Sequence, residues 1–513
     1  MRVAALAALL LLLPNLAAAE SLRLLNTSVL EYRGDNGSGD KGDKDFGVGI
    51  NKLYLDGQMD RTSVGVQVDA VAFTKYPDVP VPTAANPSAY RSEGRLKRIW
   101  LTHTLGDASV TLGDSYLQLG RGIALSLRKV DELGADQAMR GGALSWQGDT
   151  VSAKAFAGRT NVANLDTATQ KFIDDPEDTL AGASGTVHVG RADVSVHGLY
   201  LQPKTPVLDD KDGDQTVLGG AFVDLPATDW LSIYFEGAME QYRIARIDDR
   251  GTALYAAVDL DLQFASLLVE GLRLEKFRVM GSQNSLLQKP TAYNQPPTLE
   301  RIDQEVLDSE NAQGGRAKLS RSFLDGSLVV YTSGMFRRYG TASSLADAVH
   351  GYGGFELTYG DGGSRWYASG GYRQETLDGA ASPFKTMVHG ETDWVQAVGA
   401  GYALHLTVAH ENRSLKADDA SDAVDHVRGT TMVGFDKSRL GSLTAEIGYD
   451  TSGTSSQDFF LAGIAAWTPL DWLAMKAVFG SERGGLKCVG GVCREFPAFS
   501  GVRFEAAAQY DLF

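Results

Sequence analysis

Hydrophobic and polar residues alternate with a period of two along most of this chain. Residues 231–242, 251–264 and 443–450 show the pattern most clearly, and it recurs in many other segments. Alternation of this kind is typical of β-strands that have one apolar and one polar face. The alternating segments are about eight to fourteen residues long, and a tilted strand needs roughly 9–11 residues to cross a bilayer. The pattern therefore favours long strands that could span a membrane.

The amino-terminal residues 1–19 predict a secretory signal peptide. Arg2 precedes an apolar run from Val3 to Leu13, and the segment ends in small residues at Ala17–Ala19. This run is too short to span a bilayer as a helix, and its flanks match a cleavable export signal. We expect the mature chain, residues 20–513, to be exported from the cytoplasm.

The remaining sequence predicts a closed barrel. The longest later apolar run, Phe459 to Trp467, is too short for a transmembrane helix, and a chain without such helices can span a membrane only as a closed barrel. Short turns alternate with long polar loops, such as residues 202–214, 281–313 and 340–349. We expect an all-β, antiparallel transmembrane barrel of about 22 strands, within a range of about 18–24, in the cell outer membrane. A soluble chain of this length would usually form several domains.

Composition narrows the functional classes. The chain has 58 Gly, 15 Pro and 2 Cys, and its formal net charge is −16. Frequent Gly and rare Pro fit many strands joined by tight turns. The acidic balance argues against nucleic acid as a partner.

One segment resembles a known protein family. Residues 113–142 contain a Gly-Asp-x-Tyr element, a Gly-Arg-Gly element, a Leu/Arg element and a later Gly-x-Asp element. The matching residues are Gly113, Asp114, Tyr116, Gly120, Arg121, Gly122, Leu125, Arg128, Gly134, Asp136 and Gly141. This pattern resembles that of an uncharacterised, porin-like family of Gram-negative outer-membrane β-barrel proteins. Outside this segment, the resemblance covers only the general barrel layout and the region from Cys488 to Pro497. The resemblance implies that the chain forms an outer-membrane barrel, and it does not imply any particular enzymatic reaction.

The same segment suggests a lumen constriction. Its alternation breaks between residues 119 and 138, and basic side chains are interleaved with acidic ones. We hypothesise that residues 113–141 fold into the barrel as a constriction or partial plug, which arginine–carboxylate pairs would hold in place. An external loop or a plain hairpin is the alternative. The expected constriction residues are Asp114, Tyr116, Arg121, Arg128, Asp136 and Arg140.

Two further sites are predicted near loops. Cys488 and Cys493 flank a Gly-Gly turn, so in an exported chain we expect them to form a disulfide. Asp210, Asp212 and Asp214 begin like a weak calcium loop, but Ala221 occupies the position where such a loop needs Glu. A solvated acidic loop is the favoured alternative.

Other motifs bear on chemistry and on assembly. The eight His residues are scattered, and we find no set of nucleophile, base and orienting group. We therefore expect no enzymatic activity, no cofactor and no metal. Tyr510, Leu512 and Phe513 end an alternating strand, which resembles the assembly signal of outer-membrane barrels, although Phe513 falls on the polar face.

Two functions remain open. The first is a porin-like passage for small solutes with a weak preference for cations, which the net negative charge favours. The second is a plugged barrel that serves as a scaffold for a periplasmic or cell-surface partner in secretion, adhesion or motility. Barrels of this size hold either open channels or plugged lumens. In both cases we expect the chain to contact outer-membrane lipid and the barrel-assembly machinery, with an envelope protein as a further candidate partner.

Overall fold

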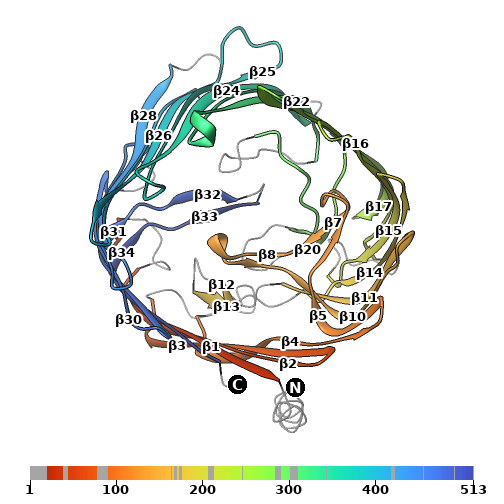
Figure 1. Cartoon of the computed structure of the whole chain (residues 1–513), viewed down its shortest axis with the longest axis horizontal. Helices are drawn as coiled ribbons and strands as arrows, with labels where there is room; N and C mark the ends of the chain where they lie inside the picture. Colours follow the sequence, from red (N-terminus) through yellow and green to blue (C-terminus); the bar gives the residue numbers. More distant parts are fainter. Residues whose placement is uncertain are drawn as a thin grey trace.

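The computed structural model describes residues 20–37, 44–77, 90–162, 165–166, 170–172, 176–205, 213–244, 246–283, 290–300, 310–341, 344–416, 422–453, 456–489 and 492–511. The predicted signal peptide, residues 1–19, lies outside the described part. Within it, twenty-four strands form one antiparallel sheet, which the pairing of β1 with β34 closes into a ring (Figure 1). The all-β barrel fold is therefore confirmed, with two strands more than the predicted number of about 22.

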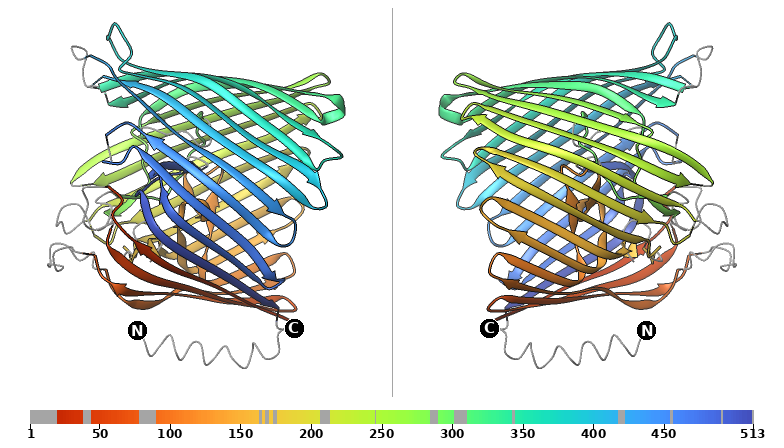
Figure 2. Two further views of the ribbon diagram at one scale, coloured as in Figure 1. Left: turned by 90° about the vertical axis from the view of Figure 1, so that its left-hand side faces the viewer. Right: turned by 90° about the vertical axis from the view of Figure 1, so that its right-hand side faces the viewer.

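The strands of the wall are long and strongly inclined, as the side views show (Figure 2). They are β1 (Ser21–Arg33), β2 (Phe46–Met59), β3 (Thr62–Lys75), β4 (Glu93–Leu105), β5 (Ala108–Ser115), β10 (Ala138–Gln147), β11 (Val151–Asn161), β14 (Thr179–Val189), β15 (Ala192–Gln202), β16 (Gln215–Thr228), β17 (Leu231–Ile244), β18 (Ile247–Leu262), β19 (Ala265–Glu275), β22 (Ala312–Phe323), β23 (Leu328–Thr341), β24 (Ser344–Tyr359), β25 (Ser364–Leu377), β26 (Lys385–Gly399), β27 (Tyr402–Leu415), β28 (Val424–Lys437), β29 (Gly441–Asp450), β30 (Phe459–Leu470), β31 (Leu473–Glu482) and β34 (Phe499–Asp511).

Shorter elements lie inside the ring (Figure 1). They are the hairpins β6 (Leu117–Leu119) with β7 (Leu125–Leu127), β8 (Lys129–Val130) with β9 (Ala135–Asp136), β12 (Leu165–Asp166) with β13 (Lys171–Phe172), β20 (Met280–Gln283) with β21 (Pro290–Ala292), and β32 (Gly485–Val489) with β33 (Val492–Phe496). Two 3-10 turns complete the described structure, η1 (Asp131–Leu133) next to β8 and η2 (Leu324–Gly326) in a wall turn. Among the described residues, no helix is long and apolar enough to cross a membrane.

The side chains of each wall strand alternate between the two faces of the ring. On β17, Ile233, Phe235 and Met239 are exposed, whereas Tyr234 and Glu236 are buried. The other exposed large apolar side chains of the wall follow the same alternation. An apolar outer face on a closed antiparallel ring is the architecture of outer-membrane barrels. The protein is therefore an outer-membrane barrel whose polar residues point inward.

The two ends of the barrel differ in their connections. Short turns join β2 to β3, β4 to β5 and β10 to β11, and the pairing of Ser21 with Gln58 places the start of β1 at this same end. In bacterial barrels, short turns face the periplasm and longer loops face the outside. The connections that enter the ring, between β5 and β10, β11 and β14, β19 and β22, and β31 and β34, all start from the long-loop end.

One expected loop is wrong. Residues 340–349 do not form a loop, because β23 continues to Thr341 and β24 already begins at Ser344. Arg338 and Asp347 are directly paired across these strands, and Arg338 Nε donates a 2.7 Å hydrogen bond to the carboxylate of Asp347. The polar side chains of this segment favoured a loop in the sequence. In the structure, the ion pair between Arg338 and Asp347 instead links β23 to β24.

Candidate functional site: the interior of the barrel

The connection between β5 and β10 forms the first inner segment, residues 116–137. Its ends already meet in the wall, where Asp114 pairs with Arg140 across neighbouring strands. The segment is therefore not needed to close the ring. Instead it enters the ring as two small hairpins, β6–β7 and β8–β9 (Figure 1). Of the residues predicted for a constriction, four lie in this segment and Asp114 and Arg140 lie in the wall at its base.

The Gly-Arg-Gly element fits tightly at the tip of this segment. Gly120 and Gly122 adopt left-handed backbone conformations, with φ of 54° and 90°. A Cβ atom on Gly120 would lie 2.1 Å from Oε1 of Glu236, and one on Gly122 would lie 2.8 Å from the carbonyl oxygen of Gln295. Only glycine meets both the backbone and the space requirement at these two positions.

Arg121 reaches the wall of the barrel at β17 and β18. Its backbone N–H donates a 2.8 Å hydrogen bond to Glu236, and its guanidinium carbon lies 3.9 Å from the ring centroid of Tyr234. Its Nη1 donates a 3.3 Å hydrogen bond to the hydroxyl of Tyr255. Tyr234 and Tyr255 are buried, whereas Arg121 is exposed. Arg121 therefore covers the packed side chains and presents its charge to the remaining interior.

The Tyr255 hydroxyl extends this contact along the wall. It donates a 2.6 Å hydrogen bond to Glu270 on β19, and Nε of Arg316 on β22 donates a 2.7 Å hydrogen bond to the same carboxylate. The chain from Arg121 to Arg316 thus links the first inner segment to three neighbouring wall strands.

Asp114 and Arg140 form the base of the segment. Arg140 donates hydrogen bonds to Asp114 from Nε at 3.1 Å and from Nη2 at 2.9 Å. Asp114 also accepts hydrogen bonds from Asn161 Nδ2 at 2.7 Å and from the backbone N–H of Ile99 at 2.8 Å. The Asp114 side chain is almost fully buried. Such a carboxylate needs all of these donors to offset its loss of hydration.

Asp136 fixes the second hairpin to β4. It pairs with Arg98 and accepts a 3.1 Å hydrogen bond from the hydroxyl of Tyr116, while Lys97 Nζ lies 3.8 Å from its other oxygen. The Arg98 guanidinium carbon also lies 4.2 Å from the ring centroid of Tyr116. Two of the predicted residues, Tyr116 and Asp136, are therefore in direct contact.

Arg128 connects the first inner segment to the third, the described part of residues 276–311. Its Nε donates to Oε1 of Gln295. Backbone hydrogen bonds run alongside, from Ser126 N–H to Tyr293 O at 2.8 Å and from Gln295 N–H to Gly122 O at 2.8 Å. The two inner segments therefore pack as one unit.

The second inner segment is the described part of residues 162–178, between β11 and β14. Asp178, at its end, joins further chain segments. Its carboxylate accepts hydrogen bonds from Tyr293 Oη and Ser282 N–H, both at 2.8 Å, and from the backbone N–H of Lys204 at 2.9 Å. The neighbouring Glu177 accepts a hydrogen bond from Lys204 Nζ, which lowers the pKa of that carboxyl.

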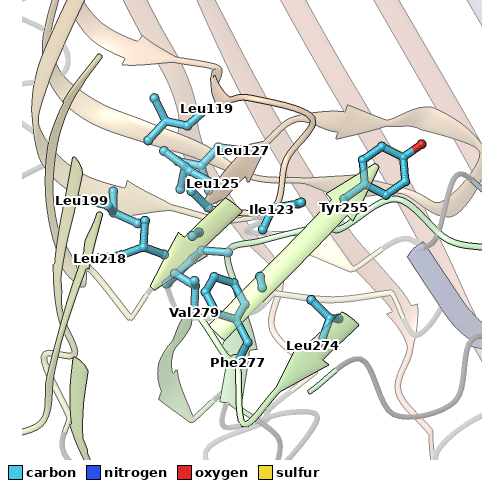
Figure 3. Close-up of a cluster of buried hydrophobic side chains, with 14 of the residues drawn as sticks. Leu119, Ile123, Leu125, Leu127, Leu199, Leu218, Tyr255, Leu274, Phe277 and Val279 are labelled. Atoms are coloured by element: carbon cyan, nitrogen blue, oxygen red, sulfur yellow. The ribbon is translucent and has the colours of Figure 1, made fainter. Parts of the chain in front are cut away.

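A hydrophobic cluster fills the space between these segments and the wall (Figure 3). Side chains of the inner segments, including Ile123, Leu125 and Phe277, pack with Leu199 and Leu218, which point inward from β15 and β16. Burying this much apolar surface stabilises the packed arrangement. One side of the interior, along β10 to β19, is consequently filled.

The opposite side of the interior keeps contact with solvent. On β27 and β28, Glu411 accepts hydrogen bonds from Arg413 Nε at 2.9 Å and Arg428 Nε at 2.6 Å. The side chains of Glu411 and Arg428 are 21% and 19% exposed, whereas the Glu236 residue on the filled side is fully buried. A second inward pair joins β1 to β34, where Arg503 is 20% exposed and its partner Glu31 is buried.

The other predicted sites are only partly described. The backbones of Cys488 and Cys493 lie directly opposite each other in the β32–β33 hairpin, but their side chains lie outside the described part of the structure. Asp210 and Asp212 also lie outside it, and Asp214 is buried. Tyr510 points outward and stacks on Trp472, whereas Leu512 and Phe513 lie outside the described residues. No group of three or more His, Cys, Asp or Glu side chains is arranged to hold a metal within the described ranges.

Comparisons with known proteins give fold-level likeness only. No family model and no curated protein matches the sequence. Among solved structures, the siderophore receptor PirA from Pseudomonas aeruginosa is similar over 96% of this chain and 80% of its own, with 8% identity and a TM-score of 0.47. The P pilus usher PapC translocation pore matches over 96% and 100%, with 8% identity and a TM-score of 0.43. OccK9 from Pseudomonas aeruginosa matches over 72% and 95%, with 12% identity and a TM-score of 0.42.

Sequence reasoning identified the inner segment but missed most of its partners. These partners all lie outside residues 113–141: Arg98, Asn161, Glu236, Tyr255 and Gln295. All except Gln295 sit on ordinary alternating wall strands. One signal was available for Glu236, since acidic residues on a strand that faces a packed interior need a donor. That signal does not identify the donor, because strand register and barrel curvature decide which segment lies next to Glu236.

Proposed function

We propose that this barrel is a porin-like passage for small solutes, narrowed by the inner segments. The observation that carries the proposal is the unequal filling of the interior. The first and third inner segments and the hydrophobic cluster occupy the side along β10 to β19. The inward ion pair of β27 and β28 and the Arg503 side chain of β34 retain exposed surface, so space for at least water adjoins them. Solutes would pass along this charged side.

The lining residues favour small hydrophilic solutes. Inward side chains of both signs alternate along the wall, as in the pair of Lys476 with Glu505 and the pair of Glu31 with Arg503. A mixed-charge lining gives moderate selectivity. The net charge of −16 tilts the proposed preference weakly toward cations.

The first inner segment would act as the constriction. Arg121 is exposed at its tip, and the hydrogen bonds of Asp114, Arg128, Asp136 and Arg140 hold the segment in place. A fixed, charged tip inside a channel controls which solutes pass beside it.

Conductance in planar bilayers tests the proposal. We expect stable single-channel steps for the full barrel, whose size scales with salt concentration. Replacing residues 117–136 by a four-residue Gly-Ser linker should increase the step size, because Ser115 and Met139 are already paired in the wall. A heat-shift gel should confirm that this variant folds.

A barrel that gives no steps with or without residues 117–136 would contradict the passage. If the barrel that shows no conductance steps also retained another envelope protein through purification, the scaffold function would replace the proposed passage. Steps of unchanged size in the linker variant would exclude the first inner segment as the constriction while leaving the passage itself intact.

A further inference from the structure

A groove lies on the outer face of the barrel near its short-turn end. It is lined by Phe435, Lys437, Leu440, Gly441, Ser442, Leu443, Ala465, Ala466 and Trp467, from β28, β29, β30 and the turn between β28 and β29. Its volume is about 270 Å³. The strand register places Phe435, Leu443 and Trp467 on the outward, lipid-facing side of the wall.

Small residues create the floor of the groove. A Cβ atom on Gly441 would lie 2.0 Å from the carbonyl oxygen of Ala466, and the backbone φ of Gly441 is 146°. Glycine therefore cannot be replaced here without moving β30. Ala465 adds only a methyl group on the same face, while the flanking Leu440 and Leu443 are 63% and 65% exposed. The result is a depression between bulky apolar side chains, shaped to accept a chain of methylene groups.

A positive charge lies beside one end of the groove. Lys437 Nζ lies 3.7 Å from the ring centroid of Tyr402 and donates a 2.5 Å hydrogen bond to the carbonyl oxygen of Ala400. These contacts hold the ammonium at the turn level, and an ammonium has three donors. Arg439 lies exposed in the same turn. Among the described residues, neither Lys437 nor Arg439 forms an ion pair.

We propose that this groove binds an anionic phospholipid of the periplasmic leaflet. Its acyl chain would lie on Gly441 and Ala465 between Leu440 and Leu443, and its phosphate would contact Lys437 and Arg439. The groove is on the face that hydrocarbon covers, and it ends at the short turns, which face the periplasm. Basic side chains at the membrane surface attract anionic headgroups, and aromatic residues such as Trp467 and Tyr402 favour that level.

Native mass spectrometry of the detergent-purified full chain tests this proposal with phosphatidylglycerol as the probe. The charge variant combines Lys437→Glu with Arg439→Glu, and Arg61→Glu, in another short turn, is its control. The groove variant is Ala465→Phe, and Gly463→Phe is its control. Gly463 is the next outward position on β30, and no atom lies within 4 Å of a Cβ placed there.

We expect retained phosphatidylglycerol to fall at least about ten-fold in the charge variant, because both basic contacts to the phosphate are reversed in sign. We expect a fall of similar size in the groove variant, because the Phe ring fills the depression that the acyl chain would occupy. Both controls should retain it. Phosphatidylethanolamine should bind less well than phosphatidylglycerol, and inorganic phosphate should not displace the lipid.

Equal retention in all four variants would overturn the proposal. Displacement by inorganic phosphate would show a free-anion site, and a co-purified protein that only Ala465→Phe removes would show a protein interface. Each of these two outcomes also rejects the lipid site. A heat-shift gel on every variant shows that the barrel remains folded.

Discussion

The guanidinium carbon of Arg121 lies 3.9 Å from the ring centroid of Tyr234, at the boundary between the filled and the solvated sides of the barrel interior. Tyr234 is buried and Arg121 is exposed. One residue therefore both holds the tip of the first inner segment and contributes a positive charge to the proposed passage. Substitution of Arg121 should therefore have two separable effects, one on the docking of the segment tip and one on ion selectivity.

Replacing Arg121 with Gln should loosen the tip and increase the preference for cations. The change removes a cation–π contact worth about 1 kcal/mol at an exposed site, and it removes a positive charge from the proposed passage. We expect faster proteolysis within residues 116–137 and a reversal potential shifted toward the cation value in a salt gradient. Arg321→Gln is the control, because Arg321 lies over Phe323 on the outer face. A shift of equal size in both variants would contradict this prediction.

Gly120→Ala should weaken docking of the first inner segment more than backbone strain alone can explain. Gly106 has a similar φ of 58°, but no atom lies within 4 Å of a Cβ placed on it. Gly106→Ala therefore reports the cost of the left-handed conformation, about 1 kcal/mol. Gly120→Ala adds the collision with Glu236. The unfolding temperature in a heat-shift gel should therefore fall further in Gly120→Ala than in Gly106→Ala, and equal falls in the two variants would exclude the Glu236 contact as the cause.

The wall of the barrel was predictable from sequence because each strand meets the same local condition. On β17 and β18 the outward positions contact lipid and the inward positions contact polar groups or the packed interior, so period-two alternation records both faces. The predicted loop at residues 340–349 was wrong where a strand departs from this rule. At residues 344–349, the outer face of β24 carries Asp347, which pairs with Arg338, where the pattern would predict an apolar side chain.

The interior was predictable only in part. Gly120, Arg121 and Gly122 stand out in sequence because glycine pairs permit conformations closed to other residues. Their partners depend on which wall strand faces the tip, and Glu236 and Tyr255 are contacted across more than a hundred residues of sequence. Arg140 pairs with Asp114 as expected for the segment, but Arg128 contacts Gln295 on another inner segment instead of a carboxylate within its own.

Asp114→Asn should strongly destabilise the barrel. Asp114 is a buried carboxylate that accepts hydrogen bonds from Arg140, Asn161 and Ile99. Arg140 is itself 38% exposed, so the main loss comes from the buried side chain at position 114, where Asn cannot accept all of these hydrogen bonds and an unpaired buried polar group costs about 1–3 kcal/mol. We expect a large drop in the temperature at which the heat-shift gel shows unfolding.

The matched control for Asp114 is Asp229→Asn. Asp229 pairs with Arg191 in the short turns, with side chains 93% and 60% exposed. An exposed pair contributes about 0–1 kcal/mol. Equal losses of thermal stability in the two variants would show that the Asp114 network does not stabilise the barrel.

Cys488 and Cys493 should both resist alkylation in protein purified without reductant. Their backbones are directly paired in the β32–β33 hairpin, and the periplasm oxidises paired thiols. Mass spectrometry after alkylation should show no modified cysteine until a reductant is added. Two alkylated thiols in the untreated protein would exclude the disulfide.

Glu411→Gln should shift the selectivity of the passage toward anions. Glu411 is the shared acceptor of the Arg413 and Arg428 guanidinium groups, and its single negative charge offsets part of their positive charge. Removing its charge leaves two partly exposed cations on the solvated side, which attract anions. We expect the reversal potential in a salt gradient to move toward the anion value, by more at low ionic strength, where charges are screened less. Asp347→Asn is the control, because this change removes a carboxylate paired with Arg338 on the outer face and should leave the reversal potential unchanged. If Glu411→Gln also leaves it unchanged while conductance persists, the solutes do not pass along β27 and β28.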